Sequence, residues 1–188
     1  MRVHLGTLVL AVSCFLALGL ISSAATTRTA EYSNRRWGFC IAYPSTWTYY
    51  EPFDGSGVEL RPITDSDGVI SLSALPTQPR DSDPSDLQTP LEGIEAGLQY
   101  MSASGEAHDL RVMQKHEERF LGHAAATVTF TYRDRGGVYW LAKEIDFSAP
   151  SRVTFHLGLK VPPEETQRFE PVFERVVRSL KLNCRDTK

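Results

Sequence analysis

WGFCIAYPSTW, residues 37–47, is the segment that decides the fold of this chain. Large and small side chains alternate over Gly38–Tyr43, which predicts a short strand, and Pro44 ends it because proline cannot donate to a sheet. The large side chains share one face, and the small Cys40 and Ala42 share the other. We expect that small face to let a helix approach closely.

The chain beyond this segment is dominated by further alternating stretches. Ala124–Arg133 has the clearest pattern, with Ala, Val, Phe and Tyr facing one way and threonines the other. Asp65–Gly68 and Asp134–Gly137 have the composition of tight turns between strands. The predicted strands are Trp47–Tyr50, Val58–Arg61, Val69–Ala74, Leu110–Phe120, Ala124–Arg133, Tyr139–Phe147 and Val153–Leu159.

Two segments have helical patterns. Thr89 can cap the first helix, Pro90 suits its first position, Glu92 completes a capping box, and Gly105 is a plausible stop. The second runs from about Glu164 to Leu180 and carries an apolar stripe, although proline interrupts it. These elements predict an α+β fold, an antiparallel sheet of about six to seven strands flanked by helices.

The amino-terminal segment has the pattern of a secretory signal peptide. Arg2 gives a basic start, Leu5–Ile21 carries no charge, and Ser22-Ser23-Ala24 supplies the small residues that a signal peptidase reads. We expect cleavage after Ala24 or Ala25, which places the mature protein in the periplasm or outside the cell.

The resulting organisation is a signal peptide over residues 1–24, a short leader over 25–30 and one domain over 31–188. The alternative is an uncleaved membrane anchor, because the apolar run reaches the short limit of a span, about 17 residues. A lipoprotein signal ending at Cys14 is a poor match, since alanine stands where such signals carry leucine.

Cys40 and Cys184 remain after signal cleavage. An even number of cysteines in an exported protein predicts a disulfide bridge between them, because that compartment is oxidising. The alternative is two unpaired thiols, with Cys40 serving as a small buried side chain.

Three local patterns resemble the PsbP-like fold family, which includes photosystem II extrinsic PsbP proteins, exported bacterial proteins and Ran-binding Mog proteins. Trp37–Trp47 is similar to the family's aromatic-rich opening, Leu121–Ala125 to its hairpin, and Phe173–Leu180 to its closing helix. The chain lacks a thylakoid transit segment, so it resembles the bacterial exported branch. The resemblance implies a non-enzymatic binding or assembly role and says more about fold than about function.

The sequence offers little support for a metal site, a cofactor or catalysis. The net charge of −3 gives no argument for nucleic acid, and neither a G-x-S-x-G motif nor an H-E-x-x-H motif occurs. His156 has no acidic partner nearby in sequence, so a hydrolase would need residues assembled from distant segments. The candidate ligands are His108, Asp109, His116, Glu117, Glu118 and His123, and, for calcium, Asp65, Asp67, Asp81, Asp83 and Asp86. We interpret both groups as solvated surface and expect no metal or cofactor.

We therefore expect a monomeric, non-enzymatic module that recognises a protein partner in the cell envelope. The candidate surface combines Arg35, Arg36 and Trp37 with Arg133 and Arg135 at a hairpin tip, since Arg and Trp often anchor interfaces. The local positive charge favours an acidic partner. The alternative is a periplasmic protein that binds a small ligand or a metal in an enclosed pocket.

Overall fold

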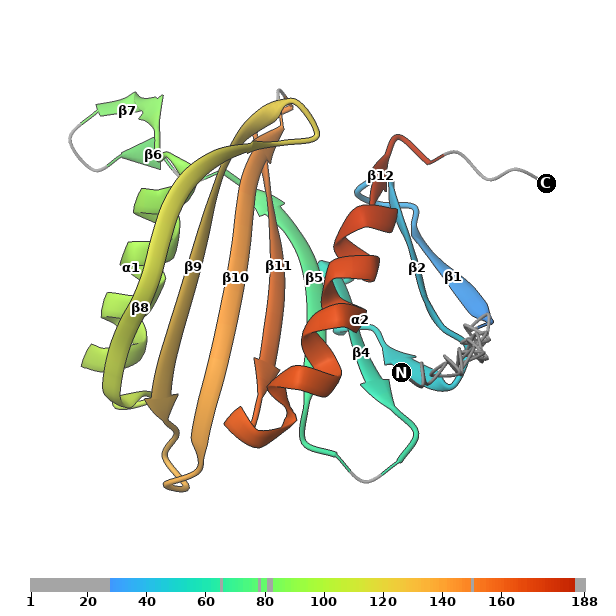
Figure 1. The fold of residues 1–188 in the computed structure, drawn as a ribbon. Coiled ribbons are helices and arrows are strands. Elements are labelled where there is room, and N and C mark those ends of the chain that lie inside the picture. Colours follow the sequence, from blue (N-terminus) through green and yellow to red (C-terminus); the bar gives the residue numbers. More distant parts are fainter. Residues whose placement is uncertain (1–27, 65, 78, 81–82, 150, 185–188) are drawn as a thin grey trace, which may run out of the picture.

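The centre of the molecule is an antiparallel sheet of seven strands in the order β3-β4-β5-β11-β10-β9-β8 (Figure 1). The structure is a computed structural model that describes residues 28–184 apart from 65, 78, 81–82 and 150. The strands of this sheet are β3 (Trp47–Tyr50), β4 (Gly57–Pro62), β5 (Val69–Pro76), β8 (His108–Phe120), β9 (His123–Arg133), β10 (Tyr139–Ala149) and β11 (Val153–Val161). The predicted α+β class and antiparallel sheet are confirmed.

A smaller sheet stands beside the large one, with the order β1-β2-β12. It consists of β1 (Thr29–Asn34), β2 (Phe39–Pro44) and β12 (Lys181–Leu182), while β6 (Pro79–Arg80) and β7 (Asp83–Leu87) form a separate hairpin. The opening strand β2 therefore lies outside the large sheet. Strand β1 was not predicted, because its residues are mostly polar, and it begins within the leader expected over residues 25–30.

The disulfide bridge predicted between Cys40 and Cys184 is present, with the two Cα atoms 5.9 Å apart. Lys181 of β12 pairs directly with Cys40, and the Cys184 amide donates to the Gly38 carbonyl over 3.1 Å. The carboxyl-terminal segment is thus held to β2 by backbone pairing as well as by the bridge. The predicted signal peptide lies outside the described residues.

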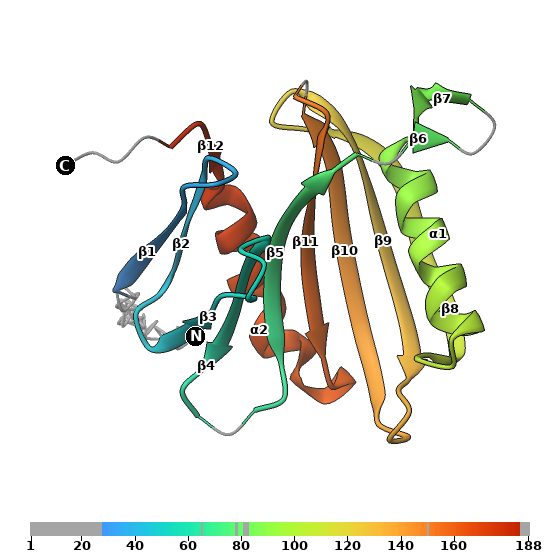
Figure 2. The same ribbon diagram turned by 180° about the vertical axis from the view of Figure 1, so that it is seen from behind.

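The two helices cover opposite faces of the large sheet (Figures 1 and 2). Helix α1 (Pro90–Ala103) packs on β9 and β10, and its Thr89 capping box is formed as predicted. Helix α2 (Thr166–Ser179) packs on β2 and β11 after a short 3₁₀ turn, η1 (Pro163–Glu165). Since neither helix covers a whole face, the α1 face stays open over β11 and β5, where Gly158 and Ser71 meet.

Helix α2 buries the apolar stripe that the sequence predicted, including Phe169, Phe173 and Val176. Pro171 lies inside the helix, where it removes one backbone hydrogen bond. A Cβ atom on Gly68 would come within 2.4 Å of the Phe169 ring, so glycine is required for this close approach. Within the described part of the chain, no helix is both long and apolar enough to cross a bilayer.

Candidate functional site

The turn between β1 and β2 carries three of the predicted site residues, Arg35, Arg36 and Trp37. Asn34, which is 6% exposed, shapes this turn. Its side-chain oxygen accepts from the Trp37 amide over 3.0 Å, and its carbonyl accepts from the Gly38 amide over 2.8 Å. A buried asparagine with paired polar groups fixes the path of the turn.

The loop between β3 and β4 lies against this turn. Asn34 donates to the Gly55 carbonyl over 3.2 Å, and the Arg36 guanidinium donates to the Asp54 carbonyl. The loop closes on itself through a 2.9 Å hydrogen bond from the Gly55 amide to the Pro52 carbonyl. These contacts brace the corner of the loop on which Phe53 sits.

Phe53 is fully exposed at that corner. The amide of Ser56 donates to Asp54 over 2.9 Å, and this bond, assisted by the nearby Arg36, lowers the pKa of the Asp54 carboxyl. The loop therefore presents an aromatic side chain to solvent on a hydrogen-bonded frame. We call Arg35, Arg36 and Phe53 the Arg–Phe tip. It borders a hollow of about 340 Å³ lined by Tyr32, Ser33, Asn34, Arg35, Arg36, Glu51 and Gly55.

Trp37 is only half-exposed and packs against the core. The Arg36 guanidinium lies 5.2 Å from the centre of its ring, a cation–π contact. The exposed aromatic residue of this surface is therefore Phe53. The sequence analysis missed Phe53, although its place in Pro52-Phe53-Asp54-Gly55, a turn-forming sequence, is a usable signal.

Arg133 and Arg135 lie at the other end of the molecule. Figures 1 and 2 place the β9–β10 hairpin at the bottom and the β1–β2 turn near β12 at the top. Arg133 is paired with Asp109 at 3.5 Å and Arg135 with Glu106 at 3.8 Å. The structure therefore does not join the two halves of the predicted surface, and acidic neighbours offset the charge of the hairpin.

The candidate metal ligands do not converge. The His116 Nε2 lies 3.5 Å from a carboxylate oxygen of Glu118, and His123 stacks on Phe147. Across the described residues, no three His, Cys, Asp or Glu side chains gather in a way that could hold a metal ion. Of the acidic residues considered for calcium, Asp65 and Asp81 lie outside the described residues.

A row of charged residues lies on the α1 face of the sheet, where the sequence analysis considered His156 but missed Glu144 and Asp146. Asp146 of β10 stands directly opposite His156 of β11, and its carboxylate contacts the imidazole Nδ1 at 2.8 Å. Glu144 lies two residues before Asp146, on the same face. Asp146 is only 2% exposed, and one of its oxygens has no hydrogen-bond partner.

Burial dominates the electrostatics of this row. It raises the pKa of Glu144 to about 7 and also raises that of Asp146. Burial opposes the charged form of His156, but its hydrogen bond to Asp146 and the two carboxylates outweigh that effect and raise its pKa. His156 is therefore poised to stay protonated beside Asp146.

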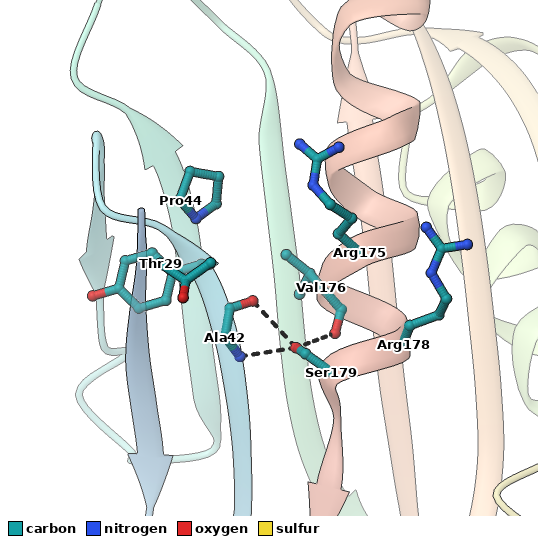
Figure 3. A pocket seen from close by; sticks show the side chains of 8 residues that line it. Thr29, Ala42, Pro44, Arg175, Val176, Arg178 and Ser179 are labelled. Atoms are coloured by element: carbon teal, nitrogen blue, oxygen red, sulfur yellow. Dashed lines mark hydrogen bonds between the residues drawn. The ribbon is translucent and has the colours of Figure 1, made fainter. Parts of the chain in front are cut away.

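A further hollow, of about 580 Å³, lies between β2 and α2 (Figure 3). Figure 3 shows Ser179 of α2 pointing at Ala42 of β2, with Arg175 and Arg178 on the helix side. The Ser179 hydroxyl accepts from the Ala42 amide over 2.8 Å and donates to the Val176 carbonyl over 2.7 Å. These bonds join helix to strand, so we interpret this hollow as part of the packing between the two.

No family model matches the sequence, and no curated protein matches it. The fold is similar to the solution structure of cyanobacterial PsbP (CyanoP) from Synechocystis sp. PCC 6803, with a TM-score of 0.59 and 17% identity, covering 88% of this chain and 98% of that one.

The chain has a PsbP-like fold. The Ran-binding protein Mog1p of Saccharomyces cerevisiae is also similar, with a TM-score of 0.58 and 8% identity over 84% of this chain and 97% of that one. LpqN of Mycobacterium tuberculosis, described as involved in cell envelope biogenesis, has a TM-score of 0.52 and 14% identity over 82% and 90%. The PsbP-like resemblance seen in the sequence is thus confirmed for the fold, and identities this low carry no residue roles across.

Proposed function

We propose that this PsbP-like chain is an exported, non-enzymatic binding module that docks onto a protein partner in the cell envelope through the Arg–Phe tip. The signal-peptide pattern and the bridge between Cys40 and Cys184 support export, because disulfides persist in oxidising compartments. Two of the similar proteins have names or descriptions that mention binding to Ran or cell envelope biogenesis. These roles belong to those proteins, and here they only make a binding role reasonable.

The observation that carries the proposal is the full exposure of Phe53 on a braced loop beside two arginines. Burying a phenylalanine side chain in a partner contributes about 2–3 kcal/mol. Because hydrogen bonds already fix the loop, little conformational entropy is lost when the partner binds. Aromatic and arginine side chains in such settings are the usual anchors of interfaces.

The partner that this surface fits carries an acidic patch next to an apolar pocket. The Arg36 guanidinium donates a hydrogen bond to the Asp54 carbonyl. Because that carbonyl is neutral, this contact does not compensate the positive charge of Arg36. An acidic patch on the partner would be steered toward the tip and would fix its orientation. An apolar pocket would accept the Phe53 ring.

Capture from an envelope extract, with the mature disulfide-bonded chain as bait, tests the proposal. We expect Phe53→Ser to reduce capture of the partner at least tenfold, and Arg36→Ala to weaken it in a salt-dependent way. Tyr100→Ser is the matched control, because Tyr100 is 65% exposed on helix α1, away from the tip. The free energies of unfolding of Phe53→Ser and Tyr100→Ser should both lie within about 0.5 kcal/mol of that of the parent. Equal capture by Phe53→Ser and Tyr100→Ser would contradict the proposal.

A further inference from the structure

The row of Glu144, Asp146 and His156 contains carboxylate oxygens that lack a hydrogen-bond donor among the described residues. Glu144 makes no hydrogen bond or ion pair with any described residue, and it lines a hollow. One oxygen of the almost completely buried Asp146 is also without a partner. Buried carboxylate oxygens are normally satisfied by donors. Glu144 lines the hollow, so an external donor can reach its carboxylate, whereas Asp146 does not line it.

The two basic side chains on this face, His156 and Lys160, do not pair with every carboxylate oxygen of the row. His156 contacts only the other oxygen of Asp146, at 2.8 Å. Lys160 lies 4.2 Å from the centre of the Trp140 ring and 5.7 Å from that of Tyr132, so aromatic rings hold its ammonium group. Lys160 lines the same hollow as Glu144, but no ion pair joins the two among the described residues. Glu144 therefore has no direct ion-pair partner within the hollow.

The hollow beside Glu144 has a volume of about 230 Å³ and a mixed lining. Its apolar wall includes Met101 of helix α1 together with Phe130 and Ala142 of the sheet, and the charged Glu59 and Lys160 also line it. Ser71 and Gly158 also line the hollow. A Cβ atom on Gly158 would lie 2.7 Å from the Ser71 hydroxyl, so glycine is the residue that fits at this contact. Such a site accepts an alkyl chain along its apolar wall and a donor at Glu144.

We propose that the hollow lined by Glu144, the carboxylate next to the buried Asp146, binds an alkylammonium group, the chemistry shared by small aliphatic amines and lysine side chains. The ammonium group supplies N–H donors for the Glu144 carboxylate, and its positive charge balances that of Glu144, since the nearby His156 is engaged by Asp146. The alkyl stem covers the apolar walls. The site shares no lining residue with the Arg–Phe tip, so it is a second site, independent of the proposed docking function.

Carbon-detected NMR of the Glu144 carboxyl group tests this in the intact disulfide-bonded chain. We titrate n-butylammonium chloride, with n-butanol as the uncharged probe of equal length and sodium chloride to match ionic strength. Binding favours the ionised form of Glu144, so its pKa should fall from about 7 by roughly one, which corresponds to tenfold tighter binding to the ionised form. A blocked Gly-Lys-Gly peptide distinguishes a lysine on another protein from a free amine.

Variants separate this site from general attraction between opposite charges. Glu144→Gln should weaken n-butylammonium binding at least tenfold, whereas Glu117→Gln, an exposed carboxyl on β8, should leave it unchanged. Lys160→Met should retain binding if Lys160 is not the natural occupant of the hollow. Near-ultraviolet circular dichroism verifies that each variant is folded.

The outcomes are decisive in both directions. A Glu144-dependent response to n-butylammonium, to the peptide or to both supports the site and names its source. Equal binding of n-butanol, equal binding by Glu144→Gln, binding that appears only in Lys160→Met, or no response to either amine overturns it.

Discussion

Replacing Glu144 by glutamine should make the protein more stable at alkaline pH. Glu144 is largely enclosed beside Asp146, and burial raises its pKa from 4.5 to about 7. At one pKa unit per 1.36 kcal/mol, keeping this carboxylate ionised in the folded state costs about 3 kcal/mol. Glutamine has nearly the same shape and no charge to desolvate, so the variant avoids that cost.

The pH dependence follows from the sign of this shift. Below pH 4.5 the carboxyl is protonated in both the folded and the unfolded chain, so it has no effect on stability. As the pH rises from 4.5 to about 7, the unfolded chain releases the proton while the folded chain keeps it, and stability falls. Above about pH 7 the loss is complete. The advantage of Glu144→Gln should therefore be near zero at pH 4 and reach about 3 kcal/mol at pH 8.

Urea unfolding followed by tryptophan fluorescence at pH 4, 5.5, 7 and 8 measures this difference. Glu117→Gln serves as the control, because its carboxyl is exposed on β8 and should give the same stability as the parent at every pH. His156 also titrates in this range, but it is present in both proteins and largely cancels in the comparison. A variant that is no more stable than the parent at pH 8, or one whose advantage is the same at pH 4, would refute the reasoning.

Three further changes test other parts of the structure. Cys184→Ser should lower the free energy of unfolding by about 2–5 kcal/mol in denaturant titrations, because it opens a bridge to Cys40 over 144 residues; reducing agent should then destabilise the parent but not the variant. Gly68→Ala should cost about 1–3 kcal/mol by pushing on the Phe169 ring, which a lower midpoint of thermal unfolding would reveal. Thr89→Ser should keep the helix cap while Thr89→Ala should cost about 1 kcal/mol, and equal stability of the two would argue against the capping role.

The sequence predicted the elements that depend on local chemistry. Strand β9 was expected over Ala124–Arg133 and occupies His123–Arg133, since strict alternation leaves few other choices. Helix α1 begins at Pro90 as expected, because capping residues specify a helix start within a few positions. Strand β1 was missed because its pairing with β2, and not its own composition, makes it extended.

The candidate sites were harder to predict because they depend on which strands become neighbours. Asp146 and His156 meet only through the register of β10 and β11, and a sequence gives no direct reading of register. Arg36 was singled out from the sequence, but its contact with the β3–β4 loop, which places Phe53 beside it, joins segments that no local pattern connects. Arg135 was grouped with it on charge alone, and the fold separates the two.

The small sheet has a consequence for the order in which the molecule can be completed. Its middle strand, β2, precedes the strands of the large sheet in the sequence, whereas one of its two neighbours, β12, and the partner of its cysteine follow them. All strands of the large sheet must therefore be synthesised before the segment around Gly38 gains its final support. A chain cut short before Cys184 would keep the residues of the large sheet yet lose the disulfide bridge near the Arg–Phe tip, so the conformation of the tip reports whether Cys40 and Cys184 have been joined.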